Sequence, residues 1–330
     1  MIYDLEELVN DEFEKLIGTD LQTVDTDKVT SDFFKKLEKI SDKVFIDILI
    51  TSGYIPDLYN KDSKEETLFT KLCEALEVNW ANRMGFEAKT VTQKSSYEDV
   101  VIKINNKIIV SDTKSFRLGR SQTAPNVKDF VKPEDYSKWA ERHSGARLGG
   151  LVVYPQLHEW TKKSDAHAYC SNKKNPILML PFHYLAYFLE RKGDFDVNEM
   201  EKLWDYNRIF PEKANGRNDY WQRINKVILE ITGDTEEHFK EFLISSETKM
   251  FEFVLTKIKN LEEQKELKIK KIESEIRSIP DNNLREEFLR YRKDFETLDF
   301  ETFKERINNF RLTKDKKSTT YAKFIDSSFE

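Results

Sequence analysis

The chain opens with apolar residues at helical intervals. Between residues 33 and 50 they are spaced as on one helix face, until Gly53 and Pro56 interrupt the pattern. A second periodic run follows Asp62-Ser63, which offers an N-cap, and it ends at Gly85. In this run the apolar residues recur at every fourth position, and they are Leu68, Leu72, Leu76, Trp80 and Met84. We therefore predict helices in the first 62 residues and one long helix between the cap and Gly85.

The middle of the chain has the residue pattern of β-strands. Residues 97–104 and 107–116 are rich in strand-forming residues, and Asn105-Asn106 separates them. Asparagine tolerates positive φ, so this two-residue junction predicts a tight hairpin turn. Two short apolar runs, at 149–154 and 177–180, are typical of buried strands.

The order of these patterns indicates an α/β fold. From His183 onward the spacing is helical nearly to the end, and residues 253–279 form a long, charged, amphipathic segment. Helices, then strands, then helices predict a central mixed β-sheet flanked by helices, with extensive additional helical segments. We expect three parts: an N-terminal helical segment at 1–62, a sheet-containing core at 63–192 and a C-terminal helical region at 193–330.

Composition excludes several classes of protein. The 330 residues contain two cysteines, Cys73 and Cys170, too few for a disulfide framework or a CxxC zinc site. We therefore expect a reducing compartment, the cytoplasm. No apolar run is long enough for a membrane span, and the first residues are acidic where a signal peptide would be basic. The net charge of -6 does not favour nucleic acid, so a DNA-binding protein would need a local basic surface and a use for its carboxylates.

The predicted hairpin carries the candidate chemistry. With the turn at Asn105-Asn106, Asp99 faces Asp112, and strand alternation places Lys114 on the same face as Asp112. Two carboxylates directly opposite each other destabilise a sheet unless a cation lies between them. Carboxylate oxygens suit Mg²⁺, and a neighbouring lysine can position water and offset phosphate charge. This set predicts hydrolysis of a phosphodiester.

The acid-x-base triplet by itself carries little information. About ten such triplets are expected by chance in a chain of this composition. The hairpin register and the preceding helix are what make this one specific. An accidental pair of aspartates beside a lysine, on a solvated strand face, remains the alternative.

One region of the sequence resembles a known family. Residues 111–120, followed by 128–130, resemble the catalytic region of the HindIII family of type II restriction endonucleases. Three further stretches are similar in the same order, at 52–56, 66–71 and 98–102. The resemblance covers roughly residues 40–210. It implies a PD-(D/E)XK nuclease fold whose sheet carries two acids and a lysine, with Mg²⁺ as cofactor and double-stranded DNA as partner, cut by a homodimer.

Carried over residue by residue, the resemblance assigns the site. It implies Asp99 and Asp112 as the metal-binding acids, Lys114 as the lysine and Glu66 as a helix glutamate near the metal. The residue before the first acid is Glu98 where many members have proline, so that half of the motif is incomplete. Strand alternation favours Asp99, because Glu98 would point to the other face. Glu66 also has a simpler interpretation, as part of an acidic first turn that favours the helix dipole.

The segment after the lysine is locally basic. From Lys114 to Arg147 eight basic residues stand against four acids. Arginine can read guanine, and asparagine or glutamine can read adenine, while other contacts hold phosphates. The candidate DNA contacts are Arg117, Arg120 and Lys128, together with Gln122 and Asn126. An ordinary solvated loop remains the alternative.

These observations predict a type II restriction endonuclease. Residues 63–192 would be its catalytic core, with a DNA-contacting loop. It would hydrolyse double-stranded DNA at a short palindrome, and each protomer of a homodimer would read one half-site. The family that the chain resembles suggests AAGCTT as the first candidate. A cognate DNA methyltransferase would be its genetic partner. Two alternatives stay open: a repair or recombination nuclease of the same fold, and a non-catalytic DNA-binding or scaffold protein.

Overall fold

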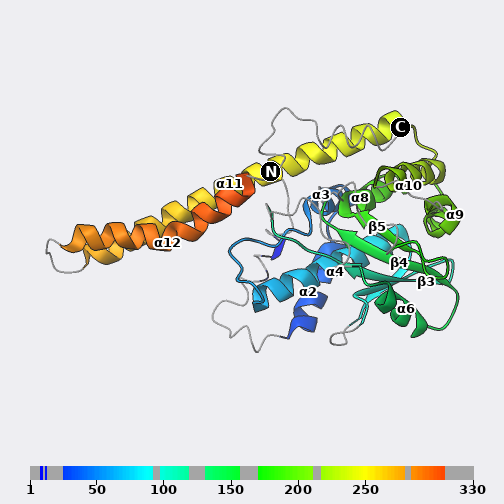
Figure 1. Cartoon of the computed structure of the whole chain (residues 1–330), viewed down its shortest axis with the longest axis horizontal. Coiled ribbons are helices and arrows are strands. Elements are labelled where there is room, and N and C mark those ends of the chain that lie inside the picture. The colour runs from blue at the N-terminus through cyan, green and yellow to red at the C-terminus, as the bar shows by residue number, and fades with distance from the viewer. Residues whose placement is uncertain are drawn as a thin grey trace. The chain divides into compact units, whose positions relative to one another are not determined.

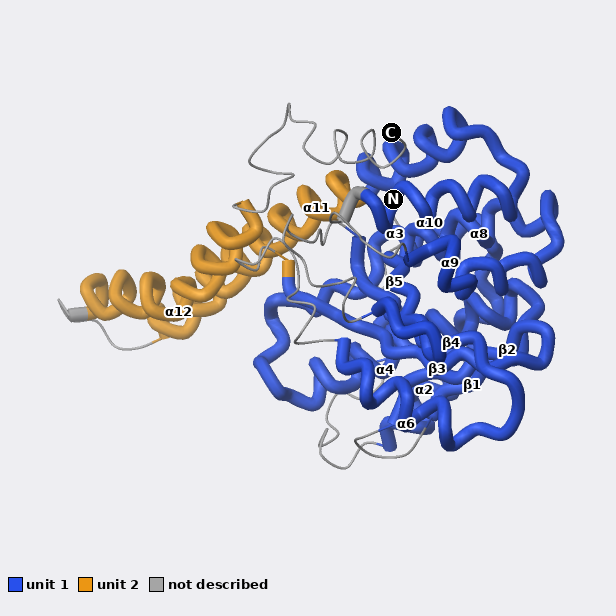
Figure 2. The backbone as a smooth tube through the Cα atoms, turned by 45° about the vertical axis from the view of Figure 1, so that its right-hand side comes forward, with its two compact units in different colours: residues 1–117, 122–249, 319–330 blue, residues 118–121, 250–318 orange. Residues whose placement is uncertain are grey.

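The computed structural model describes most of the chain as two compact units. The described residues are 8–9, 12, 25–91, 97–118, 131–156, 170–210, 217–278 and 284–308. The first unit comprises residues 1–117, 122–249 and 319–330, and the second comprises 118–121 and 250–318 (Figure 2). The predicted boundaries after residues 62 and 192 stay predictions.

The first unit is built on a five-stranded mixed sheet (Figure 1). The strands follow chain order: β1 (Glu87–Thr90), β2 (Val100–Ile104), β3 (Lys107–Thr113), β4 (Arg147–Tyr154) and β5 (Ile177–Pro181). The β1–β2 and β2–β3 pairs are antiparallel, whereas the β3–β4 and β4–β5 pairs are parallel. The parallel strands are apolar along most of their length because both of their faces are buried. The predicted mixed sheet is confirmed.

The β2–β3 turn and register are also as predicted. Asn105 and Asn106 have φ values of 50° and 62°, the positive values that a type I′ hairpin turn requires. From this turn the ladder runs without a shift to Val100 opposite Ser111. Side chains of the hairpin therefore alternate between the two faces in the phase expected from the sequence.

The ladder changes just before it reaches the two aspartates. The amide of Asp99 donates to the carbonyl of Ser111 at 2.9 Å, although Ser111 is already the register partner of Val100. Two residues of one strand thus face one residue of the other, which is the pattern of a β-bulge. The expected regular pair of Asp99 with Asp112 is wrong in this detail.

The long helix α4 (Lys64–Met84) begins and ends where the sequence predicts. Ser63 caps it, since its hydroxyl accepts from the Glu66 amide at 3.2 Å. Gly85 ends it in the left-handed conformation, with φ 93°. The helix packs on β1, β2 and β3, and its apolar stripe is buried. The segment before α4, which the sequence predicts to be helical, contains α2 (Thr26–Glu38) and α3 (Asp42–Thr51).

Further helices cover the rest of the sheet. α6 (Pro133–Glu141) packs on β3 and β4, and α8 (Phe182–Glu190) follows β5 and packs on α3 and α4. Beyond it the first unit contains η2 (Val197–Trp204), α9 (Tyr206–Ile209) and α10 (Arg217–Thr232). The second unit consists mainly of α11 (Glu236–Arg277), from residue 250 onward, and α12 (Leu284–Asn308). Within the described part of the chain, no helix combines the length and apolar content needed to cross a membrane.

Candidate active site

The structure brings Asp112 and Lys114 together at the end of β3. The Lys114 ammonium lies 2.6 Å from Oδ2 of Asp112; the Lys114 side chain is partly exposed, and that of Asp112 is mostly buried. The Lys114 amide donates to the carbonyl of Val153 at 2.8 Å, which holds this segment beside β4. The two groups therefore share one face, as strand alternation predicted, and solvent reaches them.

Asp99 completes an acid pair with Asp112. Its Oδ2 accepts from the Thr113 amide at 3.0 Å, and its carboxyl group hydrogen-bonds that of Asp112. Burial raises the pKa of Asp99, and the negative charges of Glu74 and Asp112 raise it further. Two carboxyl groups this close do not both ionise readily, because their negative charges repel each other. A bound cation or a proton removes this repulsion.

The helix carboxylate beside this pair is Glu74 of α4. Burial raises the pKa of Glu74 to about 7, against the attraction of Lys71 and with added repulsion from Asp112. Its Oε2 lies 2.8 Å from the Lys71 ammonium. Burial lowers the pKa of Lys71, but the charge and hydrogen bond of Glu74 outweigh this and the pKa is raised. Glu74 and Lys71 thus add a second acid–base pair next to Asp99.

One turn further along α4, Glu77 is fully buried. Burial raises its pKa to about 7, although hydroxyl groups of Ser111 and Thr113 favour the charged form. The Thr113 hydroxyl donates to its Oε2 at 2.5 Å. Because Thr113 turns toward α4, its strand neighbour Asp112 projects from the opposite face of β3. Glu77 therefore fixes the strand end from behind the acid pair.

The structure places Glu66 in a different position from the one the resemblance implied. Its Oε2 accepts from the Asp62 amide at 2.6 Å, and its Oε1 lies 3.3 Å from the guanidinium of Arg117. It is a helix-capping residue, about 12 Å along the α4 axis from Glu74 at the usual rise per residue. A signal for this was present, because Ser63 and Glu66 have the spacing of a capping box.

The predicted DNA contacts lie largely outside the described residues. This applies to Arg120, Gln122, Asn126 and Lys128. Arg117 is described, and besides its ion pair with Glu66 it donates to the Pro56 carbonyl at 3.0 Å. Its side chain is mostly buried, so it ties the start of this segment to α4.

Sequence reasoning missed Tyr136 of α6. Its hydroxyl donates to Oδ2 of Asp112 at 3.4 Å, and its side chain is buried. Burial, followed by the charge of Asp112, raises the pKa of Tyr136 well above its usual value, which keeps the hydroxyl protonated as a donor. A Cβ at Gly150 would lie 2.4 Å from the tyrosine ring, so the glycine makes room for it. No pattern in the sequence indicates that α6 packs over Asp112, so the contact between Tyr136 and Asp112 could not be predicted.

Glu98 makes different contacts from the Asp99–Asp112 pair. Its carboxylate is buried and pairs with the imidazole of His143. Asp99, by contrast, interacts with Asp112 and Glu74. The alternation argument that separated the two neighbouring acids therefore agrees with their contacts.

The charge balance of the site suits a divalent cation. Asp99, Asp112 and Glu74 face two ammonium groups, those of Lys71 and Lys114, and burial disfavours the ionised acids. Among the described residues no group of three or more His, Cys, Asp or Glu side chains forms a metal cage. Mg²⁺ does not need one, since it is bound through one or two carboxylates, waters and substrate phosphate. Asp99 and Asp112 fit that requirement.

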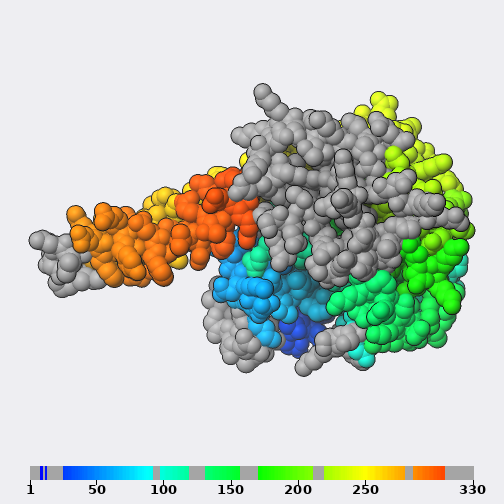
Figure 3. Space-filling view, in the orientation of Figure 1, coloured from blue at the N-terminus to red at the C-terminus, as the bar shows by residue number. Residues whose placement is uncertain are grey.

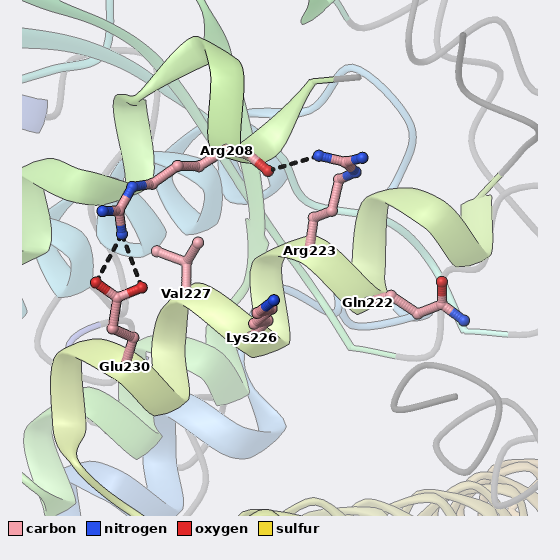
Figure 4. A pocket seen from close by; sticks show the side chains of 6 residues that line it. All are labelled: Arg208, Gln222, Arg223, Lys226, Val227 and Glu230. Carbon is pink, nitrogen blue, oxygen red and sulfur yellow. Dashed lines mark hydrogen bonds and ion pairs between the residues drawn. The ribbon is translucent and has the colours of Figure 1, made fainter. Parts of the chain in front are cut away.

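A second basic surface lies on α9 and α10 (Figure 4). Arg208 donates to both oxygens of Glu230 at 2.7 Å, and Arg223 donates to the Arg208 carbonyl at 3.2 Å. With Gln222, Lys226 and Val227 these residues line a pocket. The pocket contains none of the predicted site residues. The positive charge of Arg208 in this pocket is neutralised by Glu230.

The five-stranded mixed sheet with flanking helices is an α/β architecture consistent with a restriction endonuclease fold. The sequence model of the HindIII restriction endonuclease family matches residues 7–291, which is most of the chain. The chain belongs to the HindIII restriction endonuclease family, and the predicted resemblance is confirmed. It is thus a nuclease, a hydrolase that binds DNA. A search of curated proteins gives no match.

Proposed function

We propose that the protein is a type II restriction endonuclease that hydrolyses double-stranded DNA at a short palindrome and depends on Mg²⁺. The observation that supports this most directly is the acid pair with the Lys114 ammonium 2.6 Å from Asp112, in a chain of the HindIII restriction endonuclease family. A solvated strand face would not hold three acids with two of them largely buried.

Each residue of the site has a role in this proposal. Asp99 and Asp112 would hold Mg²⁺, which when bound neutralises phosphate charge and makes water more acidic. The Lys114 ammonium orients the attacking water and stabilises charge that develops on the phosphate. Glu74, rather than Glu66, supplies the helix carboxylate, because it is the α4 glutamate whose charge acts on both aspartates. Tyr136 holds Asp112 from the side of α6.

DNA recognition is assigned to the basic segment after the lysine. Arg120 and Lys128 would hold phosphates or guanine edges, and Gln122 and Asn126 would read bases. The engaged guanidinium of Arg117 suits it to anchoring this segment rather than to direct contact. A homodimer would read the two half-sites of a palindrome, and AAGCTT is the first target to try. A cognate DNA methyltransferase would protect the host site in the cytoplasm.

The test is a digest of a plasmid of known sequence with the purified chain and MgCl₂. We expect discrete fragments whose ends map to one short palindrome, and intact DNA when a chelator is added. Asp112→Asn should leave the plasmid whole while binding the same DNA. The matched control is Asp194→Asn, which removes an aspartate that is also ion-paired, to Arg191.

Other outcomes separate the alternatives. A smear, or preference for branched over linear DNA, would indicate a repair or recombination nuclease. DNA that stays intact with every divalent ion and every sequence tried would contradict the proposal and leave a DNA-binding protein without catalysis.

A further inference from the structure

The outer face of α12 leaves large apolar side chains exposed. Their exposed fractions are 48% for Phe288, 65% for Tyr291, 67% for Phe295 and 61% for Leu298. Among the described side chains of α12, only Thr297 and Ile307 are buried. A helix with one packing partner normally turns its large apolar residues toward that partner. In Figure 3 the atoms of α12, coloured orange to red, form part of the surface.

The inner face of the same helix is held by charge. Ion pairs join α12 to α11, and they are Lys293 with Glu273, Glu296 with Lys268, Glu301 with Lys265 and Lys304 with Glu262. Buried apolar residues such as Ile272, Ile276 and Ile307 also lie in this hairpin, so α12 carries apolar side chains both on its inner side and on its solvent-facing side. We call Phe288, Tyr291, Phe295 and Leu298 the outer stripe.

The outer stripe has the spacing of a coiled-coil seam and is symmetric about its centre. Its residues are separated by three, four and three positions, as the a and d positions of heptads are. Read from either end, the order of intervals is the same. A two-fold axis near residue 293 would therefore place Tyr291 against Phe295 of a second copy, and Phe288 against Leu298. The Tyr291 and Phe295 rings already stack, with their planes 13° apart.

Charge along α12 agrees with an antiparallel second copy. In residues 285–293 the charges give +2, from Arg285, Arg290, Arg292 and Lys293 against Glu286 and Glu287. In residues 294–301 they give -4, from Asp294, Glu296, Asp299 and Glu301. An antiparallel pair brings the basic half of each copy to the acidic half of the other, whereas a parallel pair opposes like charges. The acidic half also argues against DNA or an anionic membrane as the occupant.

We propose that the outer stripe of α12 is a self-association surface, on which a second copy of this chain packs antiparallel. From the usual area of such side chains, the stripe exposes about 400 Å² per copy and about 800 Å² in a pair. Flanking polar residues bring this close to the roughly 1,200 Å² of a small specific interface. The family match ends at residue 291, so half of the stripe lies beyond it. The proposal rests on the proposed function for the existence of a homodimer, and it adds the surface through which the two copies meet.

The first test is sedimentation velocity of the full chain over a range of micromolar concentrations. Wild type should sediment as a dimer, and the double variant Tyr291→Glu with Phe295→Glu as a monomer with an unchanged helical circular dichroism spectrum. Leu255→Glu is the matched control, because Leu255 is an exposed apolar residue on α11, outside the stripe, and it should leave the dimer intact. A monomer at every concentration, or a dimer that survives the double variant, would overturn the proposal.

The second test measures the direction of packing. Nitroxide labels at Asp294→Cys, near the axis, should lie close together in the dimer. Labels at Thr302→Cys should lie about 30 Å apart, since nine residues separate this position from the axis on each copy. The native cysteines Cys73 and Cys170 are buried, which limits unwanted labelling. Short distances at both positions would show parallel packing and refute the antiparallel arrangement. Plasmid cleavage by the same variants is scored separately, so failure of either proposal is visible by itself.

Discussion

The sheet unit buries charge, whereas the α11–α12 hairpin exposes apolar surface. In the sheet unit Glu74, Glu77 and Asp112 are among the buried residues, although carboxylates are rarely so. In the hairpin the outer stripe of α12 faces solvent, while ion pairs join the two helices. In folded proteins charged side chains are usually exposed and large apolar ones buried; the sheet unit departs from the first rule and the hairpin from the second.

Both departures cost stability, and both point to a missing partner. A buried carboxylate is unfavourable until a cation or proton neutralises it, and an exposed apolar stripe is unfavourable until another surface covers it. The difference lies in the kind of partner. The sheet unit calls for a small cation and a phosphate, and the hairpin calls for a large complementary surface.

The largest effect is expected from comparing two glutamates of α4. Glu74→Gln should lower the cleavage rate at least 100-fold, since it removes a charge beside Asp99 and Asp112. Glu66→Gln should change the rate only a few-fold and should lower the free energy of unfolding by about 1 kcal/mol through its capping contacts. Single-turnover cleavage and urea unfolding of both variants give the two numbers. The reverse order of rates would restore the assignment of Glu66 as the catalytic helix acid.

Tyr136→Phe should have an intermediate effect. Removing the hydroxyl takes away one of the two donors to Asp112 Oδ2 and leaves the Lys114 ammonium, and a hydrogen bond to a charged group is worth about 1.5 kcal/mol. We expect roughly a tenfold rise in the Mg²⁺ concentration at half-maximal cleavage. Tyr206→Phe is the control, since that tyrosine is partly exposed on α9 and belongs to neither proposed surface. An unchanged Mg²⁺ requirement would show that Tyr136 only packs the core.

The pH dependence of stability should separate the buried acids from the rest. The pKa of Glu77 is raised to about 7 in the folded state, so the folded protein binds its proton more readily than the unfolded chain does. This term is favourable near pH 5 and is lost as pH rises through 7. Relative to wild type, Glu77→Gln should therefore gain on the order of 1 kcal/mol between pH 5 and pH 8. Urea unfolding of both proteins at pH 5 and pH 8 measures this gain. If the difference in free energy of unfolding between wild type and variant is the same at both pH values, Glu77 has an ordinary pKa.

The smallest effect is expected at the hairpin turn that sets the register. Asn106 has φ 62°, which glycine adopts at lower cost. Asn106→Gly should raise the free energy of unfolding by a few tenths of a kcal/mol, and Asn106→Ala should lower it by about 1 kcal/mol. Thermal unfolding of the two variants measures this. Equal stability of both would indicate that the turn does not limit the hairpin.

What the sequence predicted well is local. The cap at Ser63, the stop at Gly85 and the asparagine turn each depend on the conformations of a few adjacent residues, and each is found where predicted. Register then follows from the turn by counting, which is why the sequence alone predicts that Asp112 and Lys114 lie on one face.

What the sequence did not reveal depends on contacts between distant segments. Glu74 and Glu77 differ from Glu66 in facing the sheet, and that is decided by how α4 packs on β2 and β3. Tyr136 reaches Asp112 across 24 positions in the sequence because α6 packs over β3. The bulge at Asp99 shifts one hydrogen bond, which no composition or spacing indicates.

The most direct measurement is a calorimetric titration of Mn²⁺, which binds the same oxygen ligands, into wild type and Asp112→Asn without DNA. Wild type should bind the ion with release of protons at pH 7, because the Asp99–Asp112 pair must give up its proton to the solvent. The variant should show no heat beyond dilution. Equal binding by the two proteins would contradict the claim that these carboxylates hold the divalent ion.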